Sequence, residues 1–280
     1  MLNNNIIPNA IDEKEYCNYI KLEFDKLLKD NSNDESKFQT FFEKNPCYLP
    51  GPHAEFDFGG PSGHGPHLNT LISQPKINGI VRRNPDFLWF AYDSGSLIPI
   101  FIEIEAPSKK IFNKNGTCTA KFTQAKNQLD EWKTILSRPE NVTSFLRTYN
   151  LPESISDLYF EPYYILIYGR RTEFENNTWL KQKRGQLLSK ANRQILMSYD
   201  RLQPRYSNGN FISSTIKEGT YKAKYLMPTF QLNPNYENLL EFSNLNSAID
   251  KMEFTSIERK AYLKEMIEEI INKPRTEDDE

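Results

Sequence analysis

Three acidic residues in the middle of the sequence have the spacing that a divalent metal site requires. They are Asp86 in NPDF (84–87) and Glu103 and Glu105 in FIEIEAP (101–107). Alternate residues of a β-strand point to the same side, so the two glutamates share one face about 7 Å apart. Burying like charges this close among apolar residues would cost several kcal/mol unless a cation compensates. Magnesium and manganese take such oxygen ligands and activate water against a phosphodiester. The alternative is an edge strand whose glutamates are solvated or paired with lysine.

Two further polar residues lie on predicted helices from which they can reach the same face. Glu35 precedes Phe38 by three residues and Phe42 by seven, so it shares the apolar side of its helix. Gln128 follows Gln124 by one turn beside an apolar stripe, and its amide can hold a phosphate oxygen or a metal-bound water. Both have simpler structural interpretations. The helix dipole favours a carboxylate in a first turn, and a polar residue beside a stripe is often only solvated.

A strand hairpin is predicted to position the acidic residues. DFLWFAYD (86–93) and LIPIFIEIEAP (97–107) are rich in β-branched and aromatic residues, and the turn-forming Ser94 and Gly95 separate them. In the second segment the glutamates alternate with isoleucines, which must face the other side. An amphipathic helix follows over residues 119–137. Five apolar residues recur there at spacings of three and four: Phe122, Ala125, Leu129, Trp132 and Leu136.

The remaining pattern predicts an α/β fold. Residues 46–79 are dense in Gly, Pro, His and Asn and indicate a long loop, and residues 203–236 give no clear element. Further helices are predicted at 12–30, 38–45, 178–192 and 255–272, and further strands at 163–169 and 194–200. We expect an N-terminal helical extension (1–33), one α/β domain (34–254), and a C-terminal helix with an acidic tail (255–280).

The composition favours an ordered globular protein, because 280 residues with 38% hydrophobic and 13% aromatic content can bury a large core. The sequence has no apolar run of membrane-spanning length and no export signal, so we expect a cytoplasmic protein that does not enter a membrane. Its three cysteines are scattered, which fits neither a disulfide framework nor a clustered zinc site. The net charge is −2, yet residues 100–205 hold 17 Lys and Arg against 11 Asp and Glu. This basic half is where a nucleic acid would bind, or else it is an ordinary solvated surface.

Several blocks of the sequence resemble the nuclease domain of the Shedu anti-phage proteins, a branch of the PD-(D/E)xK restriction-endonuclease-like superfamily. The blocks are ESKFQTFFEKNPCYLP (35–50), RRNPDF (82–87), IEIEAPSKKIFNKNG (102–116), FTQAKNQLDEW (122–132), IYGRR (167–171) and SYDRL (198–202). The resemblance implies a central mixed β-sheet flanked by helices. It also implies that Asp86, Glu103 and Glu105 gather around one or two magnesium or manganese ions.

The sequence departs from the usual superfamily pattern at one position. Glu105 stands where most members carry lysine, so the charge that stabilises the attacking hydroxide must come from elsewhere. Four lysines are candidates, and spacing selects none of them: Lys109, Lys110, Lys121 and Lys126. Arg170 and Arg171 follow a predicted strand and can hold phosphate bidentately, or they are simply exposed arginines at a strand end.

The leading interpretation is metal-dependent endonucleolytic cleavage of DNA in anti-phage defence, with Asp86, Glu103 and Glu105 as ligands and Gln128 and Glu35 beside them. A catalytically silent nucleic-acid-binding or sensor module is the alternative, because Glu105 replaces the lysine and the chain as a whole has no excess of basic residues. A third interpretation is that the shared blocks serve assembly into a homo-oligomer. Without metal, the three carboxylates should titrate as a coupled set and keep at least one proton above the ordinary pKa of about 4.

Overall fold

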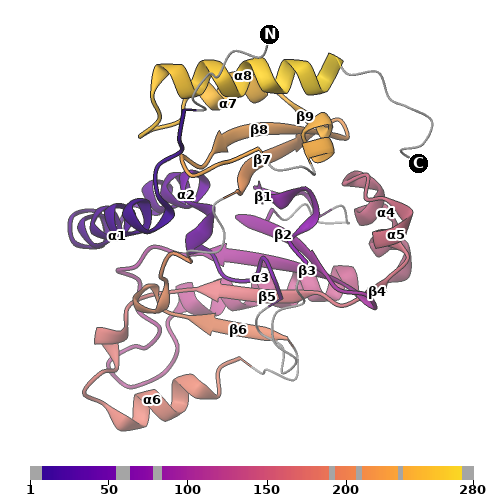
Figure 1. Ribbon diagram of the computed structural model, residues 1–280. Coiled ribbons are helices and arrows are strands. Elements are labelled where there is room, and N and C mark those ends of the chain that lie inside the picture. Colours follow the sequence, from indigo (N-terminus) through magenta and orange to yellow (C-terminus); the bar gives the residue numbers. More distant parts are fainter. Residues whose placement is uncertain are drawn as a thin grey trace.

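Figure 1 shows the computed structural model, which describes residues 8–54, 64–77, 84–188, 193–205, 210–232 and 236–272. A mixed sheet runs through the molecule in the order β6-β5-β3-β2-β1-β7-β8-β9, and β4 pairs with β3. The strands are β1 (Thr70–Ser73), β2 (Phe87–Tyr92), β3 (Ser96–Ile104), β4 (Tyr159–Phe160), β5 (Tyr163–Ile167), β6 (Gln194–Met197), β7 (Ile212–Lys217), β8 (Thr220–Leu226) and β9 (Phe242–Ser243). The helices are α1 (Glu13–Asp30), α2 (Glu35–Lys44), α3 (Ala120–Leu136), α4 (Pro139–Thr148), α5 (Glu153–Ser156), α6 (Thr178–Gly185), α7 (Leu245–Asp250) and α8 (Ile257–Asn272). The expected α/β fold with a central mixed sheet flanked by helices is confirmed.

The predicted hairpin is confirmed as β2 and β3, which pair antiparallel with Phe87 opposite Ile102. Its turn is closed by the Asp93 carboxylate, which accepts hydrogen bonds from the amides of Gly95 (2.8 Å) and Ser96 (2.7 Å). On its other side β3 pairs parallel with β5, which pairs parallel with β6. The hairpin therefore lies inside the sheet, where both of its faces are covered.

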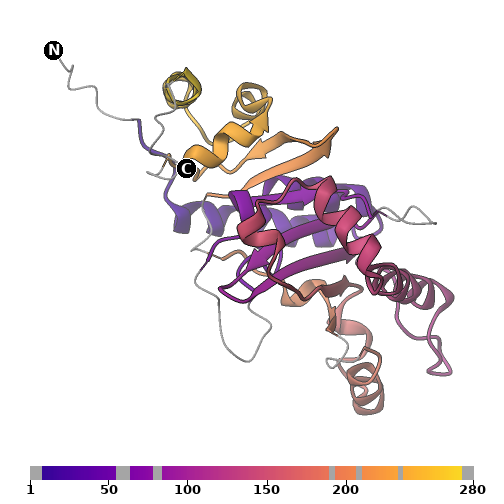
Figure 2. The same cartoon turned by 90° about the vertical axis from the view of Figure 1, so that its right-hand side faces the viewer.

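Each face of the sheet is covered by different helices, as Figures 1 and 2 show. Phe101 of β3 packs against Trp132 of α3 and Phe145 of α4. The isoleucines that alternate with it pack on the other side with α1 and α2. All five residues of the predicted α3 stripe are buried, and Thr119 caps this helix by accepting the Phe122 amide (3.2 Å). Strand alternation and helix periodicity thus fix which face each side chain takes.

The sheet also contains strands that were not predicted, among them the two-residue strands β4 and β9. Within the predicted loop at 46–79, β1 lies between β2 and β7, and within 203–236, β7 and β8 form an antiparallel hairpin. The loop prediction was wrong at β1 because four residues are too few to show a period. The β7 strand was missed because Ser213 and Ser214 are fully buried there, so polar residues occupy core positions.

The other predicted helices are present but differ at their ends, whereas α4, α5 and α7 were not predicted. The helix predicted at 178–192 ends as α6 at Gly185, and residues 189–192 lie outside the described part, as does the acidic tail at 277–280. The second helix begins at Glu35, three residues before the predicted start. In the described part of the chain, no helix is both long and apolar enough to cross a membrane.

Candidate functional site

Asp86 and Glu103 meet where the β2–β3 hairpin ends. The Asp86 amide donates to the Ile102 carbonyl (3.1 Å), and the Asp86 carboxylate accepts the Ile104 amide (2.8 Å). These two bonds hold Asp86 across from Glu103, which lies between the two β3 residues that Asp86 contacts. Glu103 is only 7% exposed, and its Oε2 atom is buried without a hydrogen-bond partner. The strand pairing therefore brings together two of the three carboxylates that the sequence analysis singled out, whereas the third, Glu105, contacts Lys109.

The surroundings of this pair favour protonated carboxyl groups. Burial raises the pKa of Asp86 to about 7, and the nearby Glu35 charge adds to this, while the bond from the Ile104 amide opposes it. Burial also raises the pKa of Glu103 well above its usual range, with repulsion from Asp86 and Glu35 as the next causes. The upward shift expected from the sequence is thus found for Asp86 and Glu103. Either a proton or a bound cation offsets the buried charge.

Lys109 is the lysine that reaches the acidic residues. Its Nζ atom contacts the Glu105 carboxylate and lies 3.1 Å from Oε2 of Glu35. The same Glu35 oxygen accepts the Ala106 amide (3.2 Å), so the first residue of α2 is bonded to the chain just beyond β3. Lys109 can approach because its amide closes a turn onto the Ala106 carbonyl (2.9 Å).

The three other candidate lysines differ in their surroundings. Lys110 and Lys121 are exposed, and Lys126 forms an ion pair with Asp130 at 3.4 Å on the same helix. The predicted helper Gln128 is half-buried on α3, but the hydrogen bonds of the carboxylates do not include it. Of the four lysines, Lys109 is therefore the one in contact with the acidic residues.

The two candidate arginines are held at the end of β5 by an aspartate. The Arg170 side chain donates to Asp200 (2.9 Å), and the backbone amide of Arg171 donates to the same carboxylate (2.6 Å). The Arg171 side chain is exposed. Arg170 would have to share or leave Asp200 in order to bind a phosphate.

A polar stripe on α2 was missed by the sequence analysis. Glu35 is followed at intervals of four residues by Gln39 and Glu43, which places all three on one side of the helix. The Gln39 amide nitrogen lies 3.5 Å from the Asp86 carbonyl and 3.3 Å from Oγ of Ser73. The spacing E-x-x-x-Q-x-x-x-E in the sequence could have predicted this stripe.

Glu43 connects this stripe to the β7–β8 hairpin. It is a buried carboxylate that accepts Oγ of Ser73 (2.5 Å) and pairs with Nζ of Lys224 on β8 (2.5 Å). A chain of contacts therefore runs from Lys224 through Glu43, Ser73 and Gln39 to the backbone of Asp86. Nothing in the sequence near Asp86 indicates this connection, because Lys224 lies far along the chain.

The donor set partly fits a divalent cation. Among the residues that the structure describes, no group of three or more His, Cys, Asp or Glu side chains forms a ready metal site. However, magnesium is commonly held by one or two carboxylates with water completing its coordination. The buried oxygen of Glu103 that lacks a partner, beside Asp86, provides such a pair.

The fold and this site define an α/β protein with a buried acidic pair at the end of a central β-hairpin. The chain belongs to the Shedu family: the family described as "Shedu protein SduA, C-terminal" matches residues 32–203. This segment contains α2, the hairpin and α3, and membership points to a role in anti-phage defence. Comparison with curated proteins gives no match.

Proposed function

We propose that this protein is a metal-dependent DNA endonuclease that acts in anti-phage defence in the cytoplasm. The observation that carries the proposal is the buried Asp86–Glu103 pair, whose carboxylate oxygen without a partner calls for a cation, in a member of the Shedu family. The PD-(D/E)xK pattern, in which two strand carboxylates and a cation serve phosphodiester hydrolysis, is consistent with this arrangement.

Asp86 and Glu103 would hold magnesium or manganese, with Glu105 as a further candidate ligand. The bound ion would activate water and neutralise charge on the phosphate. Lys109 takes the part of the lysine that Glu105 replaces, because its ammonium stands beside the acidic residues and can stabilise developing negative charge. Glu35 would orient Lys109 through their 3.1 Å contact.

DNA would approach over the basic half of the chain. Lys110, Lys121 and the Arg171 side chain are exposed and free to bind phosphates, while Lys126 and Arg170 would exchange carboxylate partners for phosphate. Gln128 remains a proposed contact to phosphate or to metal-bound water. A homo-oligomer remains a prediction of the sequence analysis.

The test is cleavage of supercoiled, nicked and linear DNA by the purified protein with EDTA, magnesium or manganese. We expect metal-dependent cleavage by the parent and none by Glu103→Gln or Asp86→Asn. Glu268→Gln, an exposed glutamate on α8, is the matched control and should cleave as the parent does. Failure of the parent to cut any of these DNAs with either metal would refute the proposal.

The silent binding module stays the second candidate, because the described residues contain no ready group of three metal ligands. In that case the parent and Glu103→Gln would bind DNA equally well, and neither would cleave it. DNA binding measured beside cleavage therefore separates the two functions.

A further inference from the structure

One tryptophan of the chain stands exposed on helix α6. Trp179 keeps 55% of its surface open to solvent, whereas Trp89 and Trp132 are fully buried in the core. Figures 1 and 2 show α6 at the margin of the molecule, beyond β6. An indole in this position offers a large, flat aromatic surface to a ligand.

The chain holds this indole in place through two contacts that are joined to each other. Lys183, one turn further along α6, has its Nζ atom 4.9 Å from the ring centroid and donates to the Gly116 carbonyl (2.7 Å). Gly116 lies so close to the ring that a Cβ atom there would be 2.3 Å from it. Because Lys183 and Gly116 are bonded to each other, they occupy one neighbourhood of the ring. The indole is therefore fixed in position while more than half of Trp179 stays exposed.

The surroundings of Trp179 are basic. Helix α6 contributes two lysines and an arginine and no acidic residue. Glu173 and Glu175 precede the helix, but the Glu173 carboxylate already accepts the backbone amides of Ile111 (2.9 Å) and Phe112 (2.7 Å). Positive charge attracts the phosphates of a nucleic acid, and an aromatic ring beside it can stack on a base. Surfaces that bind single strands combine these two properties.

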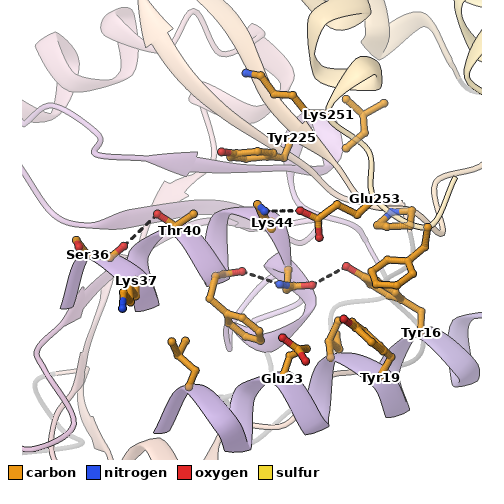
Figure 3. A pocket seen from close by; sticks show the side chains of 17 residues that line it. Tyr16, Tyr19, Glu23, Ser36, Lys37, Thr40, Lys44, Tyr225, Lys251 and Glu253 are labelled. Carbon is orange, nitrogen blue, oxygen red and sulfur yellow. Dashed lines mark hydrogen bonds and ion pairs between the residues drawn. The ribbon is translucent and has the colours of Figure 1, made fainter. Parts of the chain in front are cut away.

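Other exposed aromatic residues in the described part of the chain have less suitable surroundings. Tyr19 packs on Phe254 with ring centroids 4.4 Å apart, and Glu253 lines the same hollow between α1 and α2 (Figure 3). Tyr159 is the central residue of DLYFE (157–161), which carries an acidic residue at each end. Negative charge near a ring opposes the approach of a phosphate backbone. Trp179 is therefore the exposed ring whose own helix supplies only positive charge.

The loop that contacts Trp179 starts at the acidic site. Lys109 contacts Glu105, and Gly116 follows Lys109 by seven residues. A fully extended chain of that length spans at most about 25 Å. Successive nucleotides of one DNA strand advance by about 3.4 Å, so roughly seven nucleotides are enough to bridge the two places.

We propose that Trp179 stacks on an unpaired base of the DNA, in a strand that the basic residues of α6 attract. A ring that enters an intact duplex must first unstack a base step, whereas an unpaired base is already free to stack. The ligand is therefore a single-stranded segment. The proposal rests on the DNA binding in the proposed function and specifies which form of DNA α6 recognises, but it does not require cleavage.

The test is titration of the full chain in EDTA with a single DNA strand, with its duplex, and with an abasic strand that has the same phosphates. Since the other two of the three tryptophans are buried, direct contact with DNA is open to Trp179 alone. We expect the single strand to quench the protein fluorescence, and the duplex and the abasic strand to leave it nearly unchanged. The single strand should also bind about tenfold more tightly than the abasic strand.

Variants are compared by the fluorescence anisotropy of dye-labelled strands. Trp179→Ala should bind the single strand about tenfold more weakly than the parent and the abasic strand equally well, and Trp179→Phe should recover part of the loss. Tyr159→Ala is the matched control. Tyr159 is 66% exposed and pairs with Ser96 at the opposite end of β3 from the acidic pair, so this variant should bind as the parent does.

Circular dichroism checks that each variant is folded, and cleavage is measured separately with magnesium. The proposal is overturned if the parent binds the abasic strand as tightly as the single strand, if the duplex quenches as strongly as the single strand, or if folded Trp179→Ala binds like the parent. A parent that shows the expected quenching but cuts no DNA would refute the nuclease and support the stacking site. A parent that cuts DNA while Trp179→Ala binds unchanged would refute the stacking site alone.

Discussion

Glu103, the last residue but one of β3, has one buried carboxylate oxygen without a hydrogen-bond partner. Such a group lowers the stability of the metal-free protein, because its charged form is neither solvated nor paired. The strand tolerates it since the Ile104 amide holds Asp86 beside it and one proton can be shared between the two carboxyls. Stability at this site should therefore depend on both pH and cations.

The first prediction concerns pH. Folded Asp86 keeps its proton up to about pH 7, whereas an unfolded aspartate releases it near pH 4, so the native state binds more protons in between. Stability must then fall as pH rises through this window. In EDTA, the melting temperature should drop by several degrees from about pH 5 to about pH 8. Asp86→Asn should flatten this dependence, and magnesium should raise the melting temperature most at the alkaline end. If Asp86→Asn and the parent showed the same pH dependence of the melting temperature, Asp86 would not be the group responsible for it.

The second prediction concerns Lys109. Replacing it with Met removes the charge in contact with Glu105 and Glu35, and cleavage should fall about 10²-fold at saturating DNA. DNA binding should change little, because Lys109 contacts carboxylates rather than the open surface. Lys114→Met, an exposed lysine a few residues further on, is the control. Equal cleavage rates for the two variants would remove Lys109 from the mechanism.

Among single residues, the sequence predicted Asp86 and Glu103 but did not select Lys109 as the lysine that contacts the acidic residues. The alternation in FIEIEAP placed Glu103 on a definite face, because a strand has a fixed period. Lys109 lies beyond the end of the strand, and the direction of its side chain depends on the turn between Ala106 and Lys109. Side-chain directions in such a turn do not follow the period of a strand or a helix. Glu43 was missed for a similar reason: its partner Lys224 becomes a neighbour only when the whole sheet has formed.

Among the elements, α2 connects the acidic site with the β7–β8 hairpin. Its polar stripe contacts the Asp86 backbone through Gln39 and Lys224 through Glu43. Its apolar residues Phe38 and Phe42 are fully buried against the sheet. The position of α2 is therefore set by both its polar and its apolar contacts. Replacing Lys224 should weaken the polar contacts that hold this helix.

The third prediction tests the Lys224–Glu43 pair by a double-mutant cycle. Lys224→Met leaves Glu43 buried without its charge partner and should cost about 2–3 kcal/mol of unfolding free energy, below the range for fully buried pairs because Lys224 is 34% exposed. Adding Glu43→Gln should recover part of the loss. Denaturant unfolding measures all four proteins. Lys222→Met, on the same strand but exposed, should be near neutral, and strictly additive losses would mean that the two residues do not interact.

The β2–β3 hairpin and α3 were predicted from the sequence, and β1 and β7 were not. The β2–β3 hairpin and α3 have turn residues and apolar spacing that leave a single reading. In contrast, β1 is four residues long, and β7 buries serines that bond across strands, as Ser214 does with Thr70 (2.8 Å). Buried polar pairs satisfy each other in three dimensions, which no window of sequence shows.

At the scale of the whole molecule, the β-sheet extends beyond the segment that matches the Shedu family, residues 32–203. The match ends at residue 203, yet β1 in the centre of the sheet pairs with β7, which starts at Ile212. The C-terminal part also packs its own apolar residues onto the core that contains Leu88 and Phe90. Arg259 of α8 joins this part to the start of the chain by donating to the Pro8 carbonyl (2.6 Å).

The fourth prediction is that a chain ending at residue 205 does not fold by itself. It would lose β7–β9, α7 and α8, expose the edge of β1 and uncover apolar residues of the core. We expect aggregation or the absence of a cooperative thermal transition, measured by light scattering and calorimetry. A soluble product that melts cooperatively and keeps metal-dependent cleavage would show that residues 32–203 are self-sufficient.

The pairing of β1 with β7 also has a consequence in time. Thr70 and Ile212, which bond across these strands, are separated by 142 residues. At roughly 5–20 residues per second, a ribosome needs on the order of 7–30 s to synthesise that interval. The β2–β3 hairpin can form soon after its turn is made, but β1 must wait beside it with an unpaired edge. The newly made chain therefore holds its acidic pair before it possesses the strand that completes the pairing of β1.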